Sequence, residues 1–509
     1  MTEISSGKTI AKNTIFLYFR MLFTMAVSLY TSRVNLAVLG IEDNGIYQVV
    51  GGVIVMFGFL NSSLSGATSR FLTYELGRGD THRLKNTFAA LLNFHILTAI
   101  IIFVLGETIG FWFLETKLVI PENRMMAARI VYQFTIIQSM ITITQVPYNA
   151  SIISHERMNV FAYLSFLDVT LKLLICYLLY LTPYDRLITY GLLSLLVIFS
   201  IQMVYRGYCI KHFDECHFQF KTDYEILKPI ITFSGWDLFG NFSVMARNQG
   251  VSMIMNMFFG PVINAAVGFS NAIGTQVLGF SNNFLTAIRP PIVKAYSVGN
   301  IEKMESLMIN ASKYSFALLL LLSAPFFFES SYILELWLKT PPAYTDVFCK
   351  LELLLSVLSS MSLPLVFAIH ATAKIRFMSI VNGSIWFMVI PITWLLLKAG
   401  YDPTVPYILK IVLLLFVVIS NLYSTKKNIP DFYICEYLRR AVAPSLMTLL
   451  LSIGGTYFVF MHLGESTFVR LLITCSVSSI AVCTCTYYIL LDSEMKDKVV
   501  TIFRQKLCI

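Results

Sequence analysis

The most regular feature of the chain is a succession of apolar runs of about 20–30 residues, separated by short breaks rich in charged residues, proline or glycine. Each run is long enough to cross the bilayer core, about 30 Å thick, as a helix. Helices are expected because a lone segment in lipid must satisfy its own backbone hydrogen bonds. The pattern predicts fourteen spans, near 14–37, 44–68, 86–114, 125–152, 157–181, 186–206, 229–259, 262–288, 306–336, 345–372, 376–398, 403–424, 438–462 and 467–491.

Composition and charge support a polytopic membrane protein. The 509 residues are 56% hydrophobic and only 13% charged, whereas soluble domains have about 25% charged residues. If the N-terminus is cytoplasmic, 24 of the 38 lysines and arginines lie on the cytoplasmic side and 8 on the opposite side. This asymmetry predicts that both termini are cytoplasmic. The net charge of +9 then faces anionic headgroups, and no nucleic-acid partner is needed to explain it.

Motifs for metals and cofactors are weak. The sequence C-I-K-H-F-D-E-C-H at 209–217 could be a metal cluster, but its spacing is too cramped for a usual zinc site. We interpret it as a basic, aromatic cytoplasmic linker and expect no metal site. Of the nine cysteines, Cys349 alone is predicted near the outer face, so no disulfide framework is expected. No phosphate-binding loop is complete, and we expect no cofactor.

An internal repeat organises the chain. A shift of 220 residues aligns Leu39-Gly40 with Phe259-Gly260 and Gly79-Asp80 with Gly299-Asn300. The repeat predicts two six-helix parallel halves, with a site between them, followed by two extra helices. The predicted domains are an N-terminal six-helix lobe (1–206), a cytoplasmic linker (207–228), a C-terminal six-helix lobe (229–424), and two additional spans with a cytoplasmic tail (425–509).

Two predicted spans carry a polar face. The face in 229–259 consists of Ser234, Asp237, Asn241, Asn248 and Ser252, with Arg247 beside it, and the face in 14–37 consists of Arg20, Thr24, Ser28, Thr31 and Asn35. A charge near the bilayer centre costs at least about 2.5–3.5 kcal/mol, so each arginine should face a cavity or a partner. Two interpretations stay open. The arginines bind a ligand in a shared chamber, or they form pairs, Arg247–Asp237 or another between helices, that only hold the bundle together.

Several segments resemble a known family. They are N-T-I-F-L-Y-F-R-M-L (13–22), Y-T-S-R-V (30–34), L-G-I-E-D-N-G-I-Y-Q-V-V-G-G (39–52) and A-I-R-P-P-I-V-K-A-Y-S-V-G-N (287–300). With the 6 + 6 + 2 arrangement, they resemble the polysaccharide-transporter branch of the multidrug/oligosaccharidyl-lipid/polysaccharide exporter superfamily.

The resemblance implies an O-antigen-type flippase. Such a protein moves polyprenyl-pyrophosphate-linked oligosaccharide across the bacterial inner membrane by alternating access, with the last two spans accommodating the lipid tail. Its implied partners are this lipid-linked substrate, membrane lipids, H⁺ or Na⁺, and a polysaccharide polymerase with its chain-length regulator. Relatives that expel cationic drugs use an acidic residue in the first span, where this chain has Arg20 and no Asp or Glu.

The predicted site follows from depth and chemistry. Arg247 lies about 12 residues, or roughly 18 Å, from the outer turn at Gly260-Pro261. Its planar guanidinium matches a pyrophosphate or acidic sugar. We therefore predict substrate binding by Arg20, Arg247, Asn241 and Asn248, with Asp237 as the candidate for coupling to H⁺ or Na⁺. The alternatives are a cation-coupled drug or metabolite antiporter and, more distantly, a membrane-embedded polysaccharide polymerase, an enzyme that the short outer loops disfavour.

Overall fold

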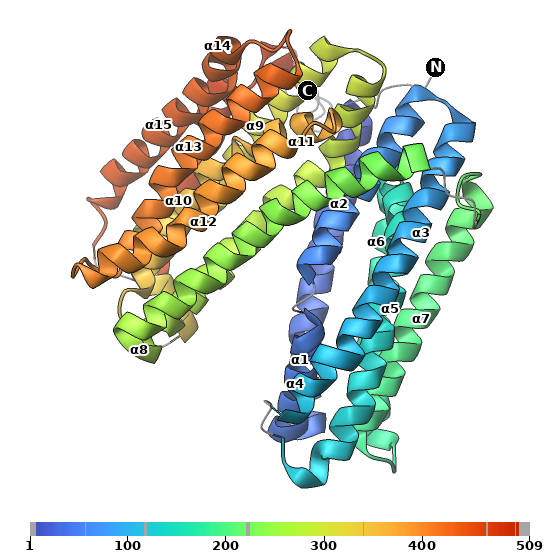
Figure 1. Cartoon of the computed structure of the whole chain (residues 1–509). Coiled ribbons are helices and arrows are strands. Elements are labelled where there is room, and N and C mark those ends of the chain that lie inside the picture. Colours follow the sequence, from blue (N-terminus) through green and yellow to red (C-terminus); the bar gives the residue numbers. More distant parts are fainter. Residues whose placement is uncertain are drawn as a thin grey trace, which may run out of the picture. The chain divides into compact units, whose positions relative to one another are not determined.

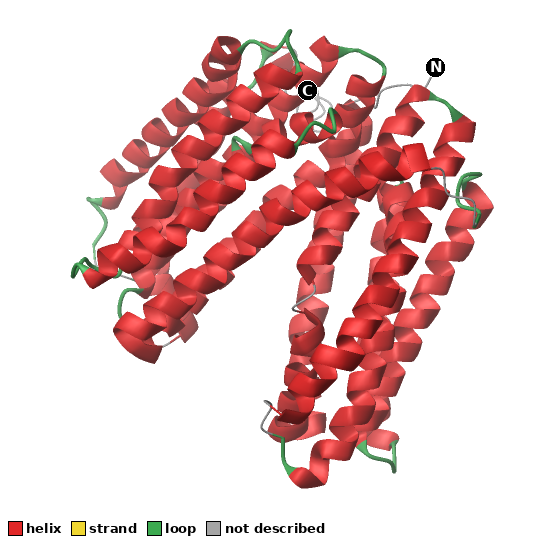
Figure 2. Cartoon of the chain, in the orientation of Figure 1, coloured by secondary structure: helices red, strands yellow, loops and turns green. Residues whose placement is uncertain are grey.

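The protein is built from helices. Its computed structural model describes residues 7–55, 58–116, 120–219, 224–338, 340–464, 467–493 and 495–497. None of these residues lies in a β-strand (Figure 2). The all-α prediction is therefore confirmed for the described part of the chain.

The chain folds into two compact units. Unit 1 consists of Met1–Asn241 and Val293–Gly299, and unit 2 consists of Phe242–Ile292 and Asn300–Ile509. The long helix α8 (Tyr224–Ser297) contributes to both units (Figure 1). The predicted domains instead place α8 from residue 229 onward in the C-terminal lobe, and their boundaries stay a prediction.

Unit 1 is a bundle of helices. They are α1 (Gly7–Val55), α2 (Gly58–Arg78), α3 (Thr81–Leu105), the π-helix η1 (Gly106–Gly110), α4 (Phe111–Thr116), the short 3-10 helix η2 (Glu122–Arg124), α5 (Met125–Ser154), α6 (Met158–Leu181) and α7 (Arg186–His212). Buried Tyr132 and Ile136 of α5 form one core with Val50 of α1 and Leu187 of α7. The central helix α5 therefore holds its neighbours together.

Unit 2 contains the remaining helices. They are α9 (Ile301–Leu338), α10 (Thr345–Ser360), α11 (Leu363–Ala371), α12 (Arg376–Lys398), α13 (Val405–Asn428), α14 (Ile434–Tyr437), the π-helix η3 (Leu438–Val442), α15 (Ala443–Phe460), α16 (Phe468–Cys485) and the π-helix η4 (Thr486–Leu490). One core joins Met255 of α8 to Phe348 of α10 and Tyr407 of α13. Phe316 of α9 and Val482 of α16 belong to a second core, so the last helices pack against α9.

The helices are those of a multi-pass membrane protein. Among the described residues, ten helical segments are long and apolar enough to cross a membrane. They are Thr81–Thr116, Glu122–Ser154, Met158–Leu181, Arg186–His212, Ile301–Leu338, Thr345–Ala371, Arg376–Lys398, Val405–Asn428, Ile434–Phe460 and Phe468–Leu490. Each coincides with one predicted span. The other four predicted spans fall in α1, α2 and α8, so the count of fourteen stays a prediction.

Two aligned glycines interrupt the longest helices. Gly40 has φ 77° and ψ 175° inside α1, and Gly260 has φ 75° and ψ −172° inside α8. This backbone conformation is accessible mainly to glycine. Since the two positions are 220 residues apart, the repeat found in the sequence extends to the backbone.

The second aligned pair forms the same turn in both places. Gly79 and Gly299 have φ 75° and 76° after α2 and α8. Asp80 then accepts a hydrogen bond from the backbone N–H of Arg83 at 2.9 Å, and Asn300 accepts one from the backbone N–H of Lys303 at 3.0 Å. A left-handed glycine that ends one helix is thus followed by a residue that caps the next.

Candidate functional site

Arg247 lies within α8, in the part that belongs to unit 2. Its Nε and Nη2 donate to Oδ1 of Asn248 at 3.1 and 2.9 Å. The guanidinium carbon lies 4.2 Å from the ring centroid of Trp386 in α12, a cation–π distance. Among the described residues of unit 2, no carboxylate forms an ion pair with Arg247. The half-buried guanidinium is therefore oriented by an amide and an aromatic ring.

A buried ion pair lies in the same unit. Nζ of Lys410 in α13 donates to Oε2 of Glu352 in α10 at 3.2 Å. Only 3% of the Lys410 side chain and 14% of the Glu352 side chain are exposed. Glu352 is also within electrostatic range of Arg247. Lys410 and Arg247 therefore both interact electrostatically with the carboxylate of Glu352.

The surrounding packing fixes this ion pair. Lys410 lies 4.6 Å from the ring centroid of Tyr407, whose hydroxyl is 2.7 Å from the Ser270 hydroxyl of α8. A Cβ added at Gly274 would lie 2.9 Å from Cγ of Glu352. The missing side chain at Gly274 thus lets Glu352 lie close against α8.

Sequence reasoning missed Glu352, Lys410 and Trp386. Lys410 is only 2% exposed within α13, so its charge lies in the interior of unit 2. The available signal was one charge at each of two apolar runs. Glu352 lies inside 351–358, and Lys410 directly precedes 411–419. Periodicity marks such charges but does not show that they pair with each other.

Asn241 and Asp237 form a local pair in the part of α8 that belongs to unit 1. Nδ2 of Asn241 donates to the Asp237 backbone carbonyl at 2.9 Å and to Oδ2 of the same residue at 3.1 Å. The two residues are one turn apart, as the predicted polar face requires. Ion coupling through Asp237 stays a prediction.

Arg20 lies in α1 of unit 1. Its guanidinium carbon is 4.6 Å from the ring centroid of Phe161 in α6. Farther along the same predicted face, Nδ2 of Asn35 donates to the Tyr190 hydroxyl at 2.9 Å, and Cys176 donates to Oδ1 of Asn35. Part of this face therefore serves helix packing.

The structure groups the predicted site residues by unit. Arg20, Asp237 and Asn241 belong to unit 1, whereas Arg247 and Asn248 belong to unit 2. The local pairs Arg247–Asn248 and Asn241–Asp237 are observed. The predicted arrangement in which Arg20 faces Arg247 across one chamber stays a prediction.

The cysteines of the loop at 209–217 are buried in packing contacts. Cys209 donates to the Tyr148 carbonyl and Cys216 to the Ser151 hydroxyl, each at 3.5 Å. The hydrogen bond with the neighbouring Cys209, followed by burial, raises the pKa of the Cys216 thiol, so it stays protonated. Cys349, which is predicted near the outer face, is fully buried in α10.

Comparison with known proteins identifies the fold. No protein-family model matches the sequence, and no curated protein matches it. The structure is similar to a MOP superfamily transporter from Pyrococcus furiosus, at TM-score 0.63 and 15% identity over 86% of this chain and 99% of that one.

Two further solved structures have the same fold. A MATE transporter from Vibrio cholerae in its bent form has TM-score 0.65 and 13% identity, covering 85% of this chain and 99% of its own. An outward-facing multidrug resistance MATE family transporter of the MOP superfamily has TM-score 0.57 and 14% identity, covering 98% of this chain and 99% of its own. The chain therefore has a MATE-like fold, and identities this low show the fold alone.

Proposed function

We propose that the chain is a flippase that moves polyprenyl-pyrophosphate-linked oligosaccharide across the bacterial inner membrane by alternating access. The observation that carries the proposal is Arg247, a permanently charged group within an apolar helix, held by Asn248 and Trp386. A charge at such depth is expensive unless it serves a partner or a ligand. A pyrophosphate offers the paired oxygens that a guanidinium fork binds best.

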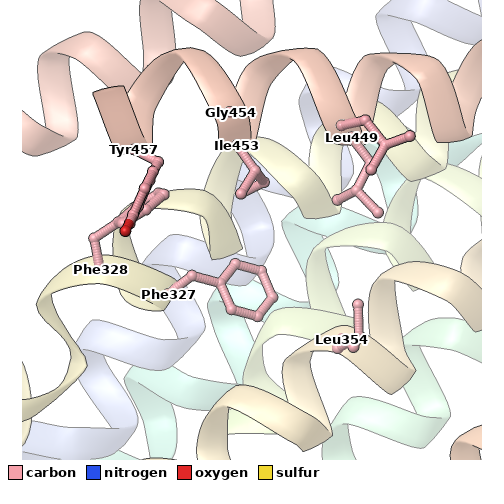
Figure 3. Close-up of a pocket in the computed structure, with 8 residues that line it drawn as sticks. Phe327, Phe328, Leu354, Leu449, Ile453, Gly454 and Tyr457 are labelled. Atoms are coloured by element: carbon pink, nitrogen blue, oxygen red, sulfur yellow. The ribbon is translucent and has the colours of Figure 1, made fainter. Parts of the chain in front are cut away.

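An apolar pocket in unit 2 supports a substrate with a lipid tail. The pocket has a volume of about 570 Å³ and is lined by Phe327, Phe328, Leu354, Leu449, Leu450, Ile453, Gly454 and Tyr457 (Figure 3). Leu450 is 72% exposed and Tyr457 50%, so the pocket opens to the surrounding lipid. The pocket therefore suits part of a polyprenyl chain, as the resemblance implies for the last two spans.

The pocket and the ion pair are at the same level along α10. Leu354 lines the pocket, and Glu352 of the ion pair precedes it by two residues. Two residues correspond to about 3 Å along a helix and about 200° around it. One helix would thus have the polar site on one side and the tail site on the other.

The wider role follows from this function. Both termini would be cytoplasmic, Asn241 and Arg20 would add contacts to the head group, and Asp237 would couple transport to H⁺ or Na⁺. A polysaccharide polymerase and its chain-length regulator would act on the product. The second candidate is a cation-coupled drug or metabolite antiporter, which is favoured by the multidrug resistance transporter among the structures of this fold.

Substitution of Arg247 tests the proposal. Full-length protein is reconstituted in proteoliposomes with polyprenyl-pyrophosphate-linked oligosaccharide, and transport is measured per folded molecule. Arg247→Ala should lower it at least about tenfold, or about 1.4 kcal/mol. Arg247→Lys should keep partial activity, because the charge survives while the bidentate geometry is lost. The matched control Arg439→Ala alters an exposed arginine of η3 and should transport normally.

The two interpretations of Arg247 predict different results. If Arg247 only stabilises packing, Arg247→Ala should reduce the amount of folded protein while each folded molecule transports normally, and that result would end the proposal. Gradient-driven transport of an organic cation, without movement of the lipid-linked oligosaccharide, would favour the antiporter instead.

A further inference from the structure

Of the charged residues in unit 2, Lys410, Glu352 and Arg247 differ in how accessible and how well paired they are. Lys410 is almost fully buried, and its ammonium contacts Glu352. Arg247 is half-buried, and its hydrogen bonds go to the neutral Asn248. The carboxylate of Glu352 is therefore bonded to Lys410, the inaccessible cation. Arg247, the more accessible cation, is bonded to a neutral amide instead.

A buried carboxylate must be compensated. Leaving one ionised and unpaired in a low-dielectric interior costs several kcal/mol. Within electrostatic range of Glu352 are two cations, Lys410 and Arg247. If Lys410 were absent, the Arg247 guanidinium would still be within electrostatic range to compensate Glu352.

We propose that Lys410 is a positioning residue that holds Glu352 and thereby keeps Arg247 available for an anionic ligand. The inference rests on the proposed role of Arg247 in binding pyrophosphate. Without Lys410, Glu352 would turn toward Arg247 and compete with the ligand for the same N–H donors. Arg247 has to remain on the Trp386 ring, open to a ligand, for the site to work.

The packing gives this role a structural basis. Gly274 lets Glu352 approach the part of α8 that follows the bend at Gly260, while Arg247 lies in the part before the bend. The Lys410 ammonium lies 4.6 Å from the centre of the Tyr407 ring, and the Tyr407 hydroxyl pairs with Ser270. Glu352 therefore contacts the Lys410 ammonium and lies within electrostatic range of a second cation, Arg247. Which cation it contacts decides whether the site accepts an anion.

The test is a suppressor experiment on the full-length protein in detergent, with inorganic pyrophosphate as the probe and calorimetry as the readout. Lys410→Met should weaken pyrophosphate binding at least about tenfold, or about 1.4 kcal/mol. The double variant Lys410→Met/Glu352→Gln should restore binding to near the wild-type affinity, because the competing carboxylate is gone. Lys410→Arg should retain most of the affinity, because a cation still holds Glu352.

A second ion pair on α10 provides the matched control. Nζ of Lys350 donates to Oδ2 of Asp346 at 2.9 Å, one turn away on the same helix. Lys350→Met therefore also removes a lysine from a carboxylate in α10, but the released carboxylate belongs to a partly exposed pair. This variant should bind pyrophosphate like the wild type.

The outcomes separate this inference from the proposed function. If wild-type protein binds pyrophosphate and folded Lys410→Met binds it equally well, Lys410 is a packing residue and the inference is wrong. If the single variant does not fold, the double variant decides: folded double variant that does not bind overturns the inference, and binding supports it. If the wild type itself does not bind pyrophosphate, the proposed function fails and the inference fails with it.

Discussion

Arg124 shows how one side chain joins three segments of unit 1. Its guanidinium donates to Asp43 of α1 through Nε and Nη2 and to Asp185 through Nη1. Asp185 also caps α7, because its Oδ1 accepts from the backbone N–H of Ile188 at 3.1 Å. The five donors of a guanidinium make such a bridge possible, whereas a lysine has a single point charge. The bridge lies outside the predicted spans.

Acid should weaken this bridge. Burial acts to raise the pKa of Asp185, but hydrogen bonds and charge from Arg124 together with backbone N–H groups outweigh it, so the pKa is lowered. Since the folded state has the lower pKa, the stabilisation is complete above the unfolded value of about 3.9 and is lost as the pH falls through the folded value. Thermal unfolding in detergent at pH 3 and pH 7 measures this loss.

Two variants identify the source of the loss. Asp185→Asn should lower the unfolding temperature at pH 7 and should show a smaller further loss at pH 3 than the wild type. Glu122→Gln removes an exposed carboxyl two residues from Arg124 and should keep the full acid dependence. An unchanged acid dependence in Asp185→Asn would assign it to other carboxyls.

Side-chain pairing also marks where sequence reasoning stopped. The polar face of residues 229–259 predicted that Asn241 and Asp237 share one side of a helix, and their hydrogen bonds agree. Residues on one helix are related by its period, so the sequence is sufficient there. Glu352 and Lys410 are 58 residues apart on different helices, and their contact depends on how α10 packs against α13. Helical periodicity does not contain that information.

Single glycines decide where the long elements bend. Most helix limits follow from the apolar pattern: the predicted span 376–398 is the observed helix Arg376–Lys398. The predicted breaks before 44 and 262 were more difficult, because the helices continue on both sides of Gly40 and Gly260. There the chain bends at one residue, without a loop. Only the left-handed φ distinguishes these glycines from those within regular helix.

Substituting these glycines should lower the free energy of unfolding through backbone strain alone. Gly40 and Gly260 have positive φ, yet an added Cβ would meet no atom within 4 Å at either position. Gly40→Ala and Gly260→Ala should therefore each destabilise the protein by about 1–3 kcal/mol. Gly268→Ala is the matched control, since it also has open space but lies in regular helix. It should be neutral or stabilising by about 0.5–1 kcal/mol.

Thermal unfolding of the three variants gives the answer. Equal unfolding temperatures for Gly260→Ala and Gly268→Ala would show that the bend in α8 adapts without strain. A lower temperature for Gly40→Ala and Gly260→Ala, but not for Gly268→Ala, would show that both halves of the repeat depend on the same backbone conformation.

At the scale of the whole molecule, the surface determines how the protein lies in the membrane. Exposed apolar side chains are spread over the described helices: Leu181 is 81% exposed, Phe458 is 71% and Leu450 is 72%. Apolar surface of this kind belongs in lipid. Composition alone predicted this environment, because it is summed over the chain and does not depend on which helices touch. The sidedness of the protein depends instead on the distribution of lysine and arginine.

Accessible cysteines on the two predicted sides test that sidedness. Cys349, Cys209 and Cys216 are all fully buried, so none of them reports on it. Cys435 in α14 is exposed and lies on the predicted cytoplasmic side. Tyr184, in the short turn between α6 and α7, is 79% exposed and lies on the predicted outer side.

In intact cells, an impermeant thiol reagent should label Tyr184→Cys in a Cys435→Ser background and should miss Cys435 in the wild type. Permeabilised cells should label both, which controls for reactivity. Labelling of Cys435 from outside, with Tyr184→Cys protected, would reverse the orientation. The leaflet from which the proposed substrate enters would then be the opposite one, because the positive side would face away from the cytoplasm.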